Sequence, residues 1–557
     1  MAWFDEAVFY HIYPLGMCGA PKENKYGQPV HRLLTLKPWI DLIKKTGFNA
    51  VYIGPLFESV GHGYETTDYK KLDSRLGTNE DLKEFVAYCH KNGIKVIFDG
   101  VFNHTGRDFF AFKDIQKNRE GSAFREWYCN VNFNGNNEYN DGFTYDNWGG
   151  YNLLVKLNQK NPAVINYITD VIKFWVREFD ADGIRLDAAD VLDFDFMKAL
   201  RKTANEVKPD FWLMGEVIHG DYSRWANSDT LHSVTNYQLH KALYSGHNDH
   251  NYFEIAHTVK RLYDMGKSFP DGMKLYNFTD NHDVERIYTK LNNKSHFVPV
   301  HVLLYTLPGV PSMYYGSEFG IEGKKEKFSD DSLRPELSID DYKNAFKDNP
   351  CTRLIAALGK MRQNTPELAY GDYSEQLLTN RQYAFSRTYN NRTVLVTVNN
   401  DDGAYNFNIP SFAHGEYTGA ISGKKVSASN GRLSVTVDGC SGEVWIPSES
   451  SSKSCSKEPV NIKIENEPKV NSKVPVKASK EAPVPKSEIK NKMPDPHDEH
   501  VVEIPEGKTY EEMTVEELQA VILQKLANNG VVTDRMKKDV YENVYHNSLV
   551  IWAKSFR

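Results

Sequence analysis

The chain has 557 residues, with 67 Lys and Arg against 74 Asp and Glu, so its formal net charge is −7 and its isoelectric point is near 6.2. This balance excludes a nucleic-acid-binding protein that relies on a basic surface. A hydrophobic fraction of 40% excludes a wholly disordered chain. At roughly 150 residues per domain, the length predicts three or four domains, or one large barrel with additions.

The N-terminus and the cysteines favour a cytoplasmic protein that acts away from membranes. Asp5 and Glu6 interrupt the first apolar residues and no basic stretch precedes them, so we expect no secretion signal. No apolar run reaches the roughly 18 residues that a spanning helix needs. The 6 cysteines are scattered without a C-x-x-C pair, which disfavours a disulfide framework or a zinc site.

The first two-thirds of the chain alternate short apolar runs with amphipathic helical stretches. The candidate strands are residues 8–13, 50–53, 95–99, 183–187, 212–216, 233–235, 275–277 and 311–315. They lack a strict alternation of polar and apolar residues, which is typical of parallel strands covered on both faces. Repeated β-α units over about 370 residues predict a (β/α)8 TIM barrel. A doubly wound sheet is the alternative, but no G-x-G-x-x-G follows the first strand.

Two helices between these strands have readable ends. Thr78 and Asp81 form a candidate capping box, and Gly93 ends that helix. Asn161 and Pro162 begin another, whose predicted buried face is Ile165, Ile168, Ile172, Trp175 and Phe179.

The rest of the chain divides into segments of different composition. An Asn-, Gly- and aromatic-rich stretch after the third strand predicts a lobe inserted in the barrel, since loops this long are usually functional. Short β-type runs with Gly and Asn turns predict a C-terminal β-sandwich. A Ser-, Lys-, Glu- and Pro-rich stretch predicts a disordered linker, and a capping box at Thr514–Glu517 begins a small helical module. The predicted domains are 1–103 and 153–370 (barrel), 104–152 (lobe), 371–447 (β-sandwich), 448–505 (linker) and 506–557 (helical module).

Three acidic residues lie where candidate strands end. Asp187 and Glu216 close strand-like runs and Asp283 follows one, and such ends converge at the face of a barrel where active sites lie. Arg185 falls on the same face as Asp187, because side chains alternate along a strand. Its charge is expected to keep Asp187 ionised, as a nucleophile requires. Converging carboxylates of this kind, one anionic and one protonated, are the machinery of glycoside hydrolysis.

Four motifs in order resemble those of the alpha-amylase family of retaining α-glucan-active enzymes. Residues 99–104 resemble D-x-V-x-N-H, residues 183–187 resemble G-x-R-x-D, residues 215–217 resemble the third motif, and residues 278–283 end in the N-H-D core of the fourth. The resemblance covers residues 8–447 and does not extend to the linker or the tail.

The resemblance implies a role for each motif residue. Asp187 would be the nucleophile, Glu216 the general acid and base, and Asp283 the residue that holds the sugar and stabilises the transition state. The implied substrate-binding residues are Tyr64, which would stack on the sugar ring, with His104, Arg185 and His282. Asn103 would contribute to a calcium site, for which Asp141 and Asp146 are the acidic candidates; no organic cofactor is implied. After Asp187, the sequence Ala188-Ala189-Asp190 departs from the Lys-His pair of many α-amylases.

Further motifs resemble the neopullulanase, cyclomaltodextrinase and maltogenic amylase group. Residues 155–158 resemble its M-P-K-L-N element, and residues 216–219 with 233–237 resemble it as well; the extra N-terminal domain of the group is not seen. The implied function is hydrolysis of α-1,4-glucosidic bonds in malto-oligosaccharides, cyclodextrins or starch-type glucans. Open alternatives are a transglycosylase, an α-1,6-acting relative, and a non-catalytic sugar-binding or assembly protein. The helical module is expected to bind a protein partner or to mediate self-association.

Overall fold

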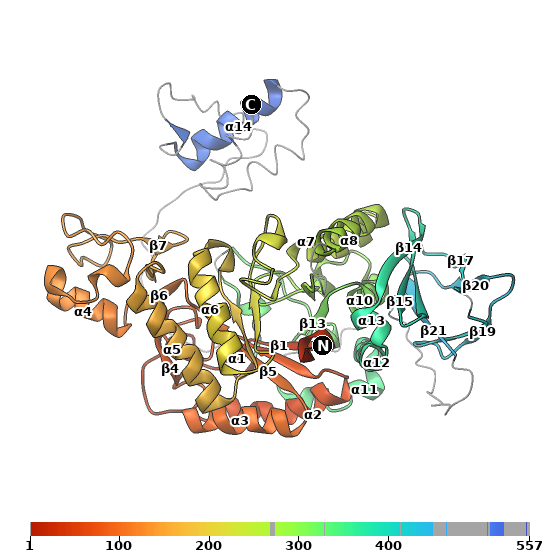
Figure 1. Ribbon diagram of the computed structural model, residues 1–557, viewed down its shortest axis with the longest axis horizontal. Helices are drawn as coiled ribbons and strands as arrows, with labels where there is room; N and C mark the ends of the chain where they lie inside the picture. The colour runs from red at the N-terminus through yellow and green to blue at the C-terminus, as the bar shows by residue number, and fades with distance from the viewer. Residues whose placement is uncertain are drawn as a thin grey trace, which may run out of the picture. The chain divides into compact units, whose positions relative to one another are not determined.

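The structure is a computed structural model that describes residues 2–267, 273–327, 329–412, 414–448, 464, 509–510, 513–528 and 553. The chain forms two compact units, Met1–Lys469 and Val470–Arg557. The first unit holds a barrel, an inserted lobe and a β-sandwich (Figure 1).

The core of the first unit is an eight-stranded parallel sheet in the order β11-β10-β9-β5-β2-β1-β13-β12. Its strands are β1 (Phe9–Ile12), β2 (Ala50–Ile53), β5 (Lys95–Gly100), β9 (Gly183–Leu186), β10 (Trp212–Gly215), β11 (Ser233–Val234), β12 (Tyr276–Phe278) and β13 (Val310–Tyr314). A parallel bridge between Thr235 and Tyr276 joins the two end strands, so the sheet closes into a barrel. This closed parallel sheet confirms the predicted (β/α)8 barrel. The prediction was possible because parallel strands buried on both faces leave an apolar pattern in the sequence.

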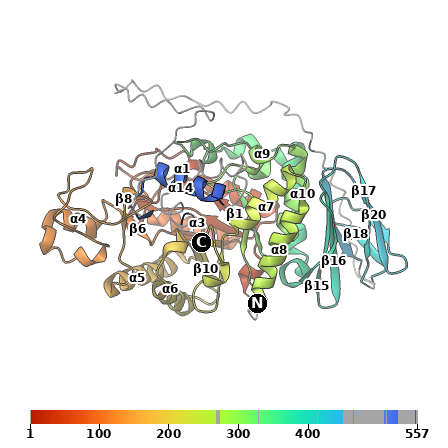
Figure 2. The same ribbon diagram turned by 90° about the horizontal axis from the view of Figure 1, so that it is seen from above.

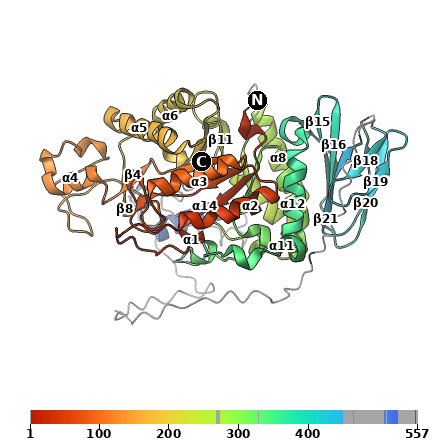
Figure 3. The same cartoon turned by 90° about the horizontal axis from the view of Figure 1, so that it is seen from below.

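Helices cover the outside of the barrel, as Figures 2 and 3 show from opposite sides. They include α2 (Lys37–Lys45), α3 (Asn79–Lys91), α5 (Pro162–Phe179), α6 (Phe194–Val207), α7 (Tyr237–Asn248), α8 (Tyr252–Gly266), α10 (Phe297–Thr306) and α12 (Pro350–Gln363). Both predicted starts are confirmed: Thr78 and Asp81 form a capping box on α3, and the Asn161 side chain accepts from the Ala163 N–H of α5. On the predicted face of α5, Ile168, Ile172, Trp175 and Phe179 are buried, and Ile165 is partly buried and packs against the same core. Val164 and Val171 are buried as well and widen this apolar stripe.

The lobe follows β5. It consists of α4 (Phe110–Asn118) and a small antiparallel sheet of β6 (His104–Gly106), β8 (Tyr151–Lys156) and β7 (Asn147–Trp148). Its aromatic residues mostly form its own core: Phe112 meets Tyr128, Phe143 and Tyr145 with ring centroids 4.9–5.8 Å apart. These three rings are buried and serve packing.

The C-terminal part of the unit is a β-sandwich, as predicted. A six-stranded sheet packs against the pair β17 (Tyr405–Pro410) and β20 (Arg432–Val437) around a core that contains Phe407, Leu433 and Trp445. The strands of the larger sheet are β14 (Asp372–Leu378), β15 (Gln382–Tyr389), β16 (Arg392–Asn399), β21 (Ser441–Pro447), β18 (Glu416–Gly419) and β19 (Lys425–Ser427).

The second unit contains α14 (Val515–Asn528). The predicted capping box at its start is present, since the Glu517 carboxylate accepts from the Thr514 N–H at 2.7 Å and the Thr514 hydroxyl accepts from the Glu517 N–H at 3.2 Å. The linker prediction falls almost entirely outside the described residues. Ser448 and Ile464 are its described residues, and Ile464 packs in the core of the first unit while its carbonyl accepts from the Ser295 hydroxyl at 2.7 Å. Among the described helices, none is long and apolar enough to cross a membrane.

Candidate active site

The residues of the candidate site lie at or just beyond the carboxyl ends of four barrel strands. Asp99 belongs to β5 and Arg185 to β9, and the strand register pairs them directly. Asp187 and Glu216 follow β9 and β10, and Asp283 follows β12. The barrel therefore brings the three predicted carboxylates to the face on which such folds carry out catalysis.

Arg185 is the centre of this site. Its Nη1 lies 2.9 Å from Asp99 Oδ1 and 3.0 Å from Asp187 Oδ1, and its Nη2 lies 2.8 Å from Glu216 Oε2. The backbone N–H of Ala188 also donates to Glu216 Oε2, at 3.0 Å. One guanidinium, 3% exposed, thus fixes the relative positions of three carboxylates.

The pKa of Asp187 moves opposite to the sequence prediction. Burial raises the pKa of this carboxyl, and the nearby Glu216, Asp99 and Asp283 raise it further, while Arg185 lowers it. The net shift is upward because one positive charge is shared among several carboxylates. Arg185 lowers the pKa of Asp187 as expected, but it does not outweigh burial and the neighbouring carboxylates, so the expectation that its charge keeps Asp187 ionised was wrong.

Asp283 has a different environment. Arg334 Nη2 lies 2.8 Å from Asp283 Oδ1, and His282 Nε2 lies 3.0 Å from Asp283 Oδ2. Burial raises the pKa of Asp283, but the charge and hydrogen bond of His282, with Arg334 and Arg185, outweigh it and leave the pKa lowered. The surroundings of Asp283 therefore favour its ionised form.

The predicted ring residues also meet here. The Tyr64 hydroxyl lies 3.2 Å from Asp99 Oδ2 and contacts His282 Nε2. The Tyr64 and His282 rings are near parallel, with centroids 5.7 Å apart. His104 lies behind them: its Nε2 is 3.1 Å from the Tyr64 carbonyl, and its Nδ1 is 3.2 Å from Asn103 Nδ2. Burial lowers the pKa of His104 to about 3, so its imidazole is neutral at physiological pH.

The described residues do not form the acidic cluster that the predicted calcium site requires. In the described part of the chain, no group of three or more His, Cys, Asp or Glu side chains is arranged to hold a metal. Asn103 Oδ1 is buried without a hydrogen-bond partner, but both oxygens of Asp141 accept from Arg107, at 2.7 and 2.8 Å. Asp146 Oδ2 accepts from Asn130 Nδ2 at 2.9 Å. The proposed donors therefore do not fit a calcium site, and we assign calcium no chemical step.

Several residues of the site were not assigned from the sequence. Asp99 opens the first motif, and its place at a strand end was a usable signal. No feature of the sequence pointed to Arg334 or Tyr13. Arg334 lies in a loop after β13, where its Nε donates to the His282 carbonyl at 3.0 Å and its guanidinium carbon lies 4.7 Å from the centroid of the Tyr13 ring. The Tyr237 hydroxyl donates to Glu216 Oε1 at 3.4 Å.

Carboxylates that converge at one face of a (β/α)8 barrel are the arrangement that glycoside hydrolases use. Residues 36–353 match the family model described as alpha amylase, catalytic domain, and the chain belongs to the alpha-amylase family. A cyclomaltodextrinase of Thermoanaerobacter pseudethanolicus is 31% identical over 428 residues, which cover 72% of this chain and 71% of that protein. Neopullulanase 2 of Thermoactinomyces vulgaris is 28% identical over 78% of this chain and 76% of its own length.

Solved structures agree with this assignment. A cyclomaltodextrinase structure has a TM-score of 0.70 at 26% identity and covers 80% of this chain and 78% of its own. The debranching enzyme of Nostoc punctiforme has a TM-score of 0.69 at 25% identity and covers 80% of this chain and 98% of its own. The chain therefore resembles these proteins over the barrel and the β-sandwich together.

Proposed function

We propose that the protein hydrolyses α-1,4-glucosidic bonds of malto-oligosaccharides, cyclodextrins or starch-type α-glucans with retention of anomeric configuration. The observation that carries this proposal is the bridging of Asp187 and Glu216 by Arg185, with Asp283 ionised nearby. Relatives named cyclomaltodextrinase, maltogenic alpha-amylase and neopullulanase support the substrate class. A relative named intracellular maltogenic amylase, from Bacillus subtilis, supports a cytoplasmic location as part of the same proposal.

The proposed reaction has two displacements at the anomeric carbon. Glu216 gives its proton to the glycosidic oxygen while Asp187 attacks C1, so the C1–O bond breaks and a glycosyl-enzyme ester forms. Glu216, now a carboxylate, takes a proton from water, which attacks C1 and releases Asp187. Asp283 stabilises the positive charge that develops on the sugar, and Tyr64, His282 and His104 shape the site for that ring.

The test is the product profile on maltoheptaose, β-cyclodextrin, pullulan and starch, with the anomer formed first read by proton NMR. We expect the α-anomer at early times, because two inversions retain configuration. First-formed β-anomer would contradict the assignment of Asp187 as nucleophile. Longer products at high maltotriose concentration would favour the transglycosylase. Release of maltotriose from pullulan without turnover of maltoheptaose would favour the α-1,6-acting alternative, which the likeness to a debranching enzyme supports.

We infer that the helical module, residues 506–557, serves contact with a protein partner or with a second copy of the chain. A chain truncated after Lys469 is expected to keep wild-type kcat on the preferred glucan, because the barrel, lobe and β-sandwich all precede that residue. The matched truncation after Pro447 also removes Ile464 and is expected to lower the melting temperature. Loss of turnover in the longer truncation would show that the tail belongs to the enzyme.

A further inference from the structure

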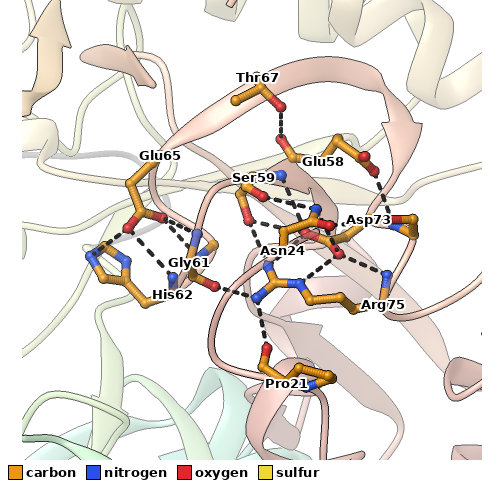
Figure 4. A network of polar contacts seen from close by, with 12 residues as sticks. Pro21, Asn24, Glu58, Ser59, Gly61, His62, Glu65, Thr67, Asp73 and Arg75 are labelled. Atoms are coloured by element: carbon orange, nitrogen blue, oxygen red, sulfur yellow. Dashed lines mark hydrogen bonds and ion pairs between the residues drawn. The ribbon is translucent and has the colours of Figure 1, made fainter. Parts of the chain in front are cut away.

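Residues 61–65 carry Tyr64 into the site and form what we call the Tyr64 loop. The loop connects β3 (Phe57–Ser59) to β4 (Thr66–Leu72) and has no regular secondary structure. Figure 4 shows that it is nevertheless tied into a network of polar contacts. An irregular loop that is fixed in this way costs less entropy to order around a ligand.

The Glu65 carboxylate accepts hydrogen bonds from the backbone of its own loop. Its Oε2 accepts from the N–H groups of Gly61 and Gly63 at 3.3 and 3.2 Å, and its Oε1 lies 3.1 Å from His62 Nε2. The Tyr64 N–H donates to His62 Nδ1 at 3.4 Å, so Nδ1 is the accepting nitrogen of His62 and Nε2 is the nitrogen that faces Glu65. Glu65 is 3% exposed, which makes each of these bonds costly to lose.

Three side chains from outside the loop donate hydrogen bonds to its carbonyl groups. Arg75 Nη1 donates to the Gly61 carbonyl at 2.6 Å, the Tyr13 hydroxyl to the His62 carbonyl at 2.5 Å, and His104 Nε2 to the Tyr64 carbonyl at 3.1 Å. Arg75 is itself fixed by Asp73, 2.7 Å away (Figure 4). The backbone on both sides of Tyr64 therefore has one arrangement, which directs the ring toward Asp99 and His282.

Gly63 adds a steric condition to the same arrangement. Its φ is +101°, and a Cβ there would lie 2.5 Å from the Pro55 side chain. Only glycine adopts this conformation without strain.

We propose that Glu65 is a positioning residue whose charge sets the Tyr64 loop and thereby places the Tyr64 ring in the catalytic site. The inference rests on the proposed function, in which this ring contacts the sugar whose bond is cleaved. Glu65 itself does not touch the reacting atoms. Its effect reaches the chemistry through the geometry of one aromatic ring, and displacements of about 1 Å in such groups cost up to about 100-fold in rate.

The test is Glu65→Gln, which keeps the shape of the side chain but replaces one accepting oxygen with a donor. We expect kcat on malto-oligosaccharides to fall about 10- to 100-fold while KM changes less than about twofold, because the other sugars of the chain still bind. Glu65→Asp keeps the charge and is expected to recover part of kcat.

The matched control is Glu58→Gln. Glu58 is a buried carboxylate of the same hairpin that accepts from the Ser74 N–H at 2.9 Å and from Lys71 Nζ at 3.1 Å, outside the Tyr64 loop. We expect Glu58→Gln to lower the melting temperature and to leave kcat unchanged. Wild-type kcat in Glu65→Gln, or an equal loss in both variants that follows the folded fraction, would overturn the proposal.

A second readout does not depend on turnover. In the wild-type protein, the 15N shifts of His62 are expected to show an accepting Nδ1 and a hydrogen on Nε2, and this tautomer is expected to be lost in Glu65→Gln. If the wild-type chain cleaves no α-glucan, the proposed function fails while these shifts still decide the role of Glu65. Unchanged 15N shifts of His62 in Glu65→Gln would contradict the role of Glu65 as a positioning residue.

Discussion

Glu216→Gln is expected to lower kcat on malto-oligosaccharides by about 10²- to 10⁴-fold, the usual contribution of a general acid. Gln has no proton to give to the glycosidic oxygen, although it keeps the contact with the Ala188 N–H. Asp187→Asn is expected to cost about 10⁴-fold or more, because the covalent intermediate no longer forms. The melting temperatures of both variants should stay close to wild type or rise, since each removes one carboxylate from a crowded site.

A substrate that needs no proton separates the two roles. Fluoride leaves without protonation, so α-maltosyl fluoride should form the glycosyl-enzyme rapidly with Glu216→Gln and not with Asp187→Asn. Glu254→Gln is the control, because Glu254 pairs with Lys241 at the surface of α7 and α8. Equal loss of fluoride turnover in both active-site variants would contradict the separate roles, and wild-type activity in Glu216→Gln would reject the catalytic site altogether.

Arg185→Met is expected to destabilise the protein by about 3–5 kcal/mol at pH 8, because it leaves Asp99, Asp187 and Glu216 together without their shared cation. The loss should shrink as the pH falls. Burial and neighbouring carboxylates already raise the pKa of Asp187, and Arg185 is the group that lowers it, so without Arg185 the folded state binds a proton at Asp187 more readily than the unfolded state does. Lowering the pH therefore favours folding of the variant, and the difference from wild type should be smaller at pH 5 than at pH 8.

Urea unfolding of the variant and the wild-type protein at both pH values measures this difference. The matched control is Arg362→Met. Arg362 is equally buried, but its guanidinium donates to the carbonyls of Tyr305 and Gly309 at 2.9 and 2.7 Å. Its loss should cost stability to a similar degree at pH 5 and pH 8, because carbonyls do not titrate. A deficit of Arg185→Met that grows toward pH 5 would show that the carboxylates are not the cause.

The partner of Asp141 in the lobe could not be predicted from the sequence. The resemblance to the alpha-amylase family implied a calcium site with Asn103, for which Asp141 and Asp146 were the acidic candidates. The structure gives Asp141 a bidentate partner in Arg107, whose guanidinium also donates to the Tyr145 hydroxyl at 2.6 Å. Arginine and a carboxylate separated by 34 residues meet only after folding, so no spacing in the sequence revealed that the carboxylate was already neutralised.

The sequence by itself determined the barrel, the β-sandwich and the positions of the candidate carboxylates. Buried parallel strands and capped helices leave local patterns, and a carboxylate that ends a strand is located by the strand itself. The sequence alone therefore places Asp187, Glu216 and Asp283 at one face of the barrel.

Only the tertiary structure decided which groups surround those carboxylates. Arg334 reaches Asp283 across 51 residues, and Glu65 and Arg75 hold the loop that carries Tyr64. It also decided the direction of the Asp187 pKa, since burial and neighbouring carboxylates outweigh one arginine. These properties depend on distances and desolvation among residues far apart along the chain, and such quantities have no local signature in a sequence.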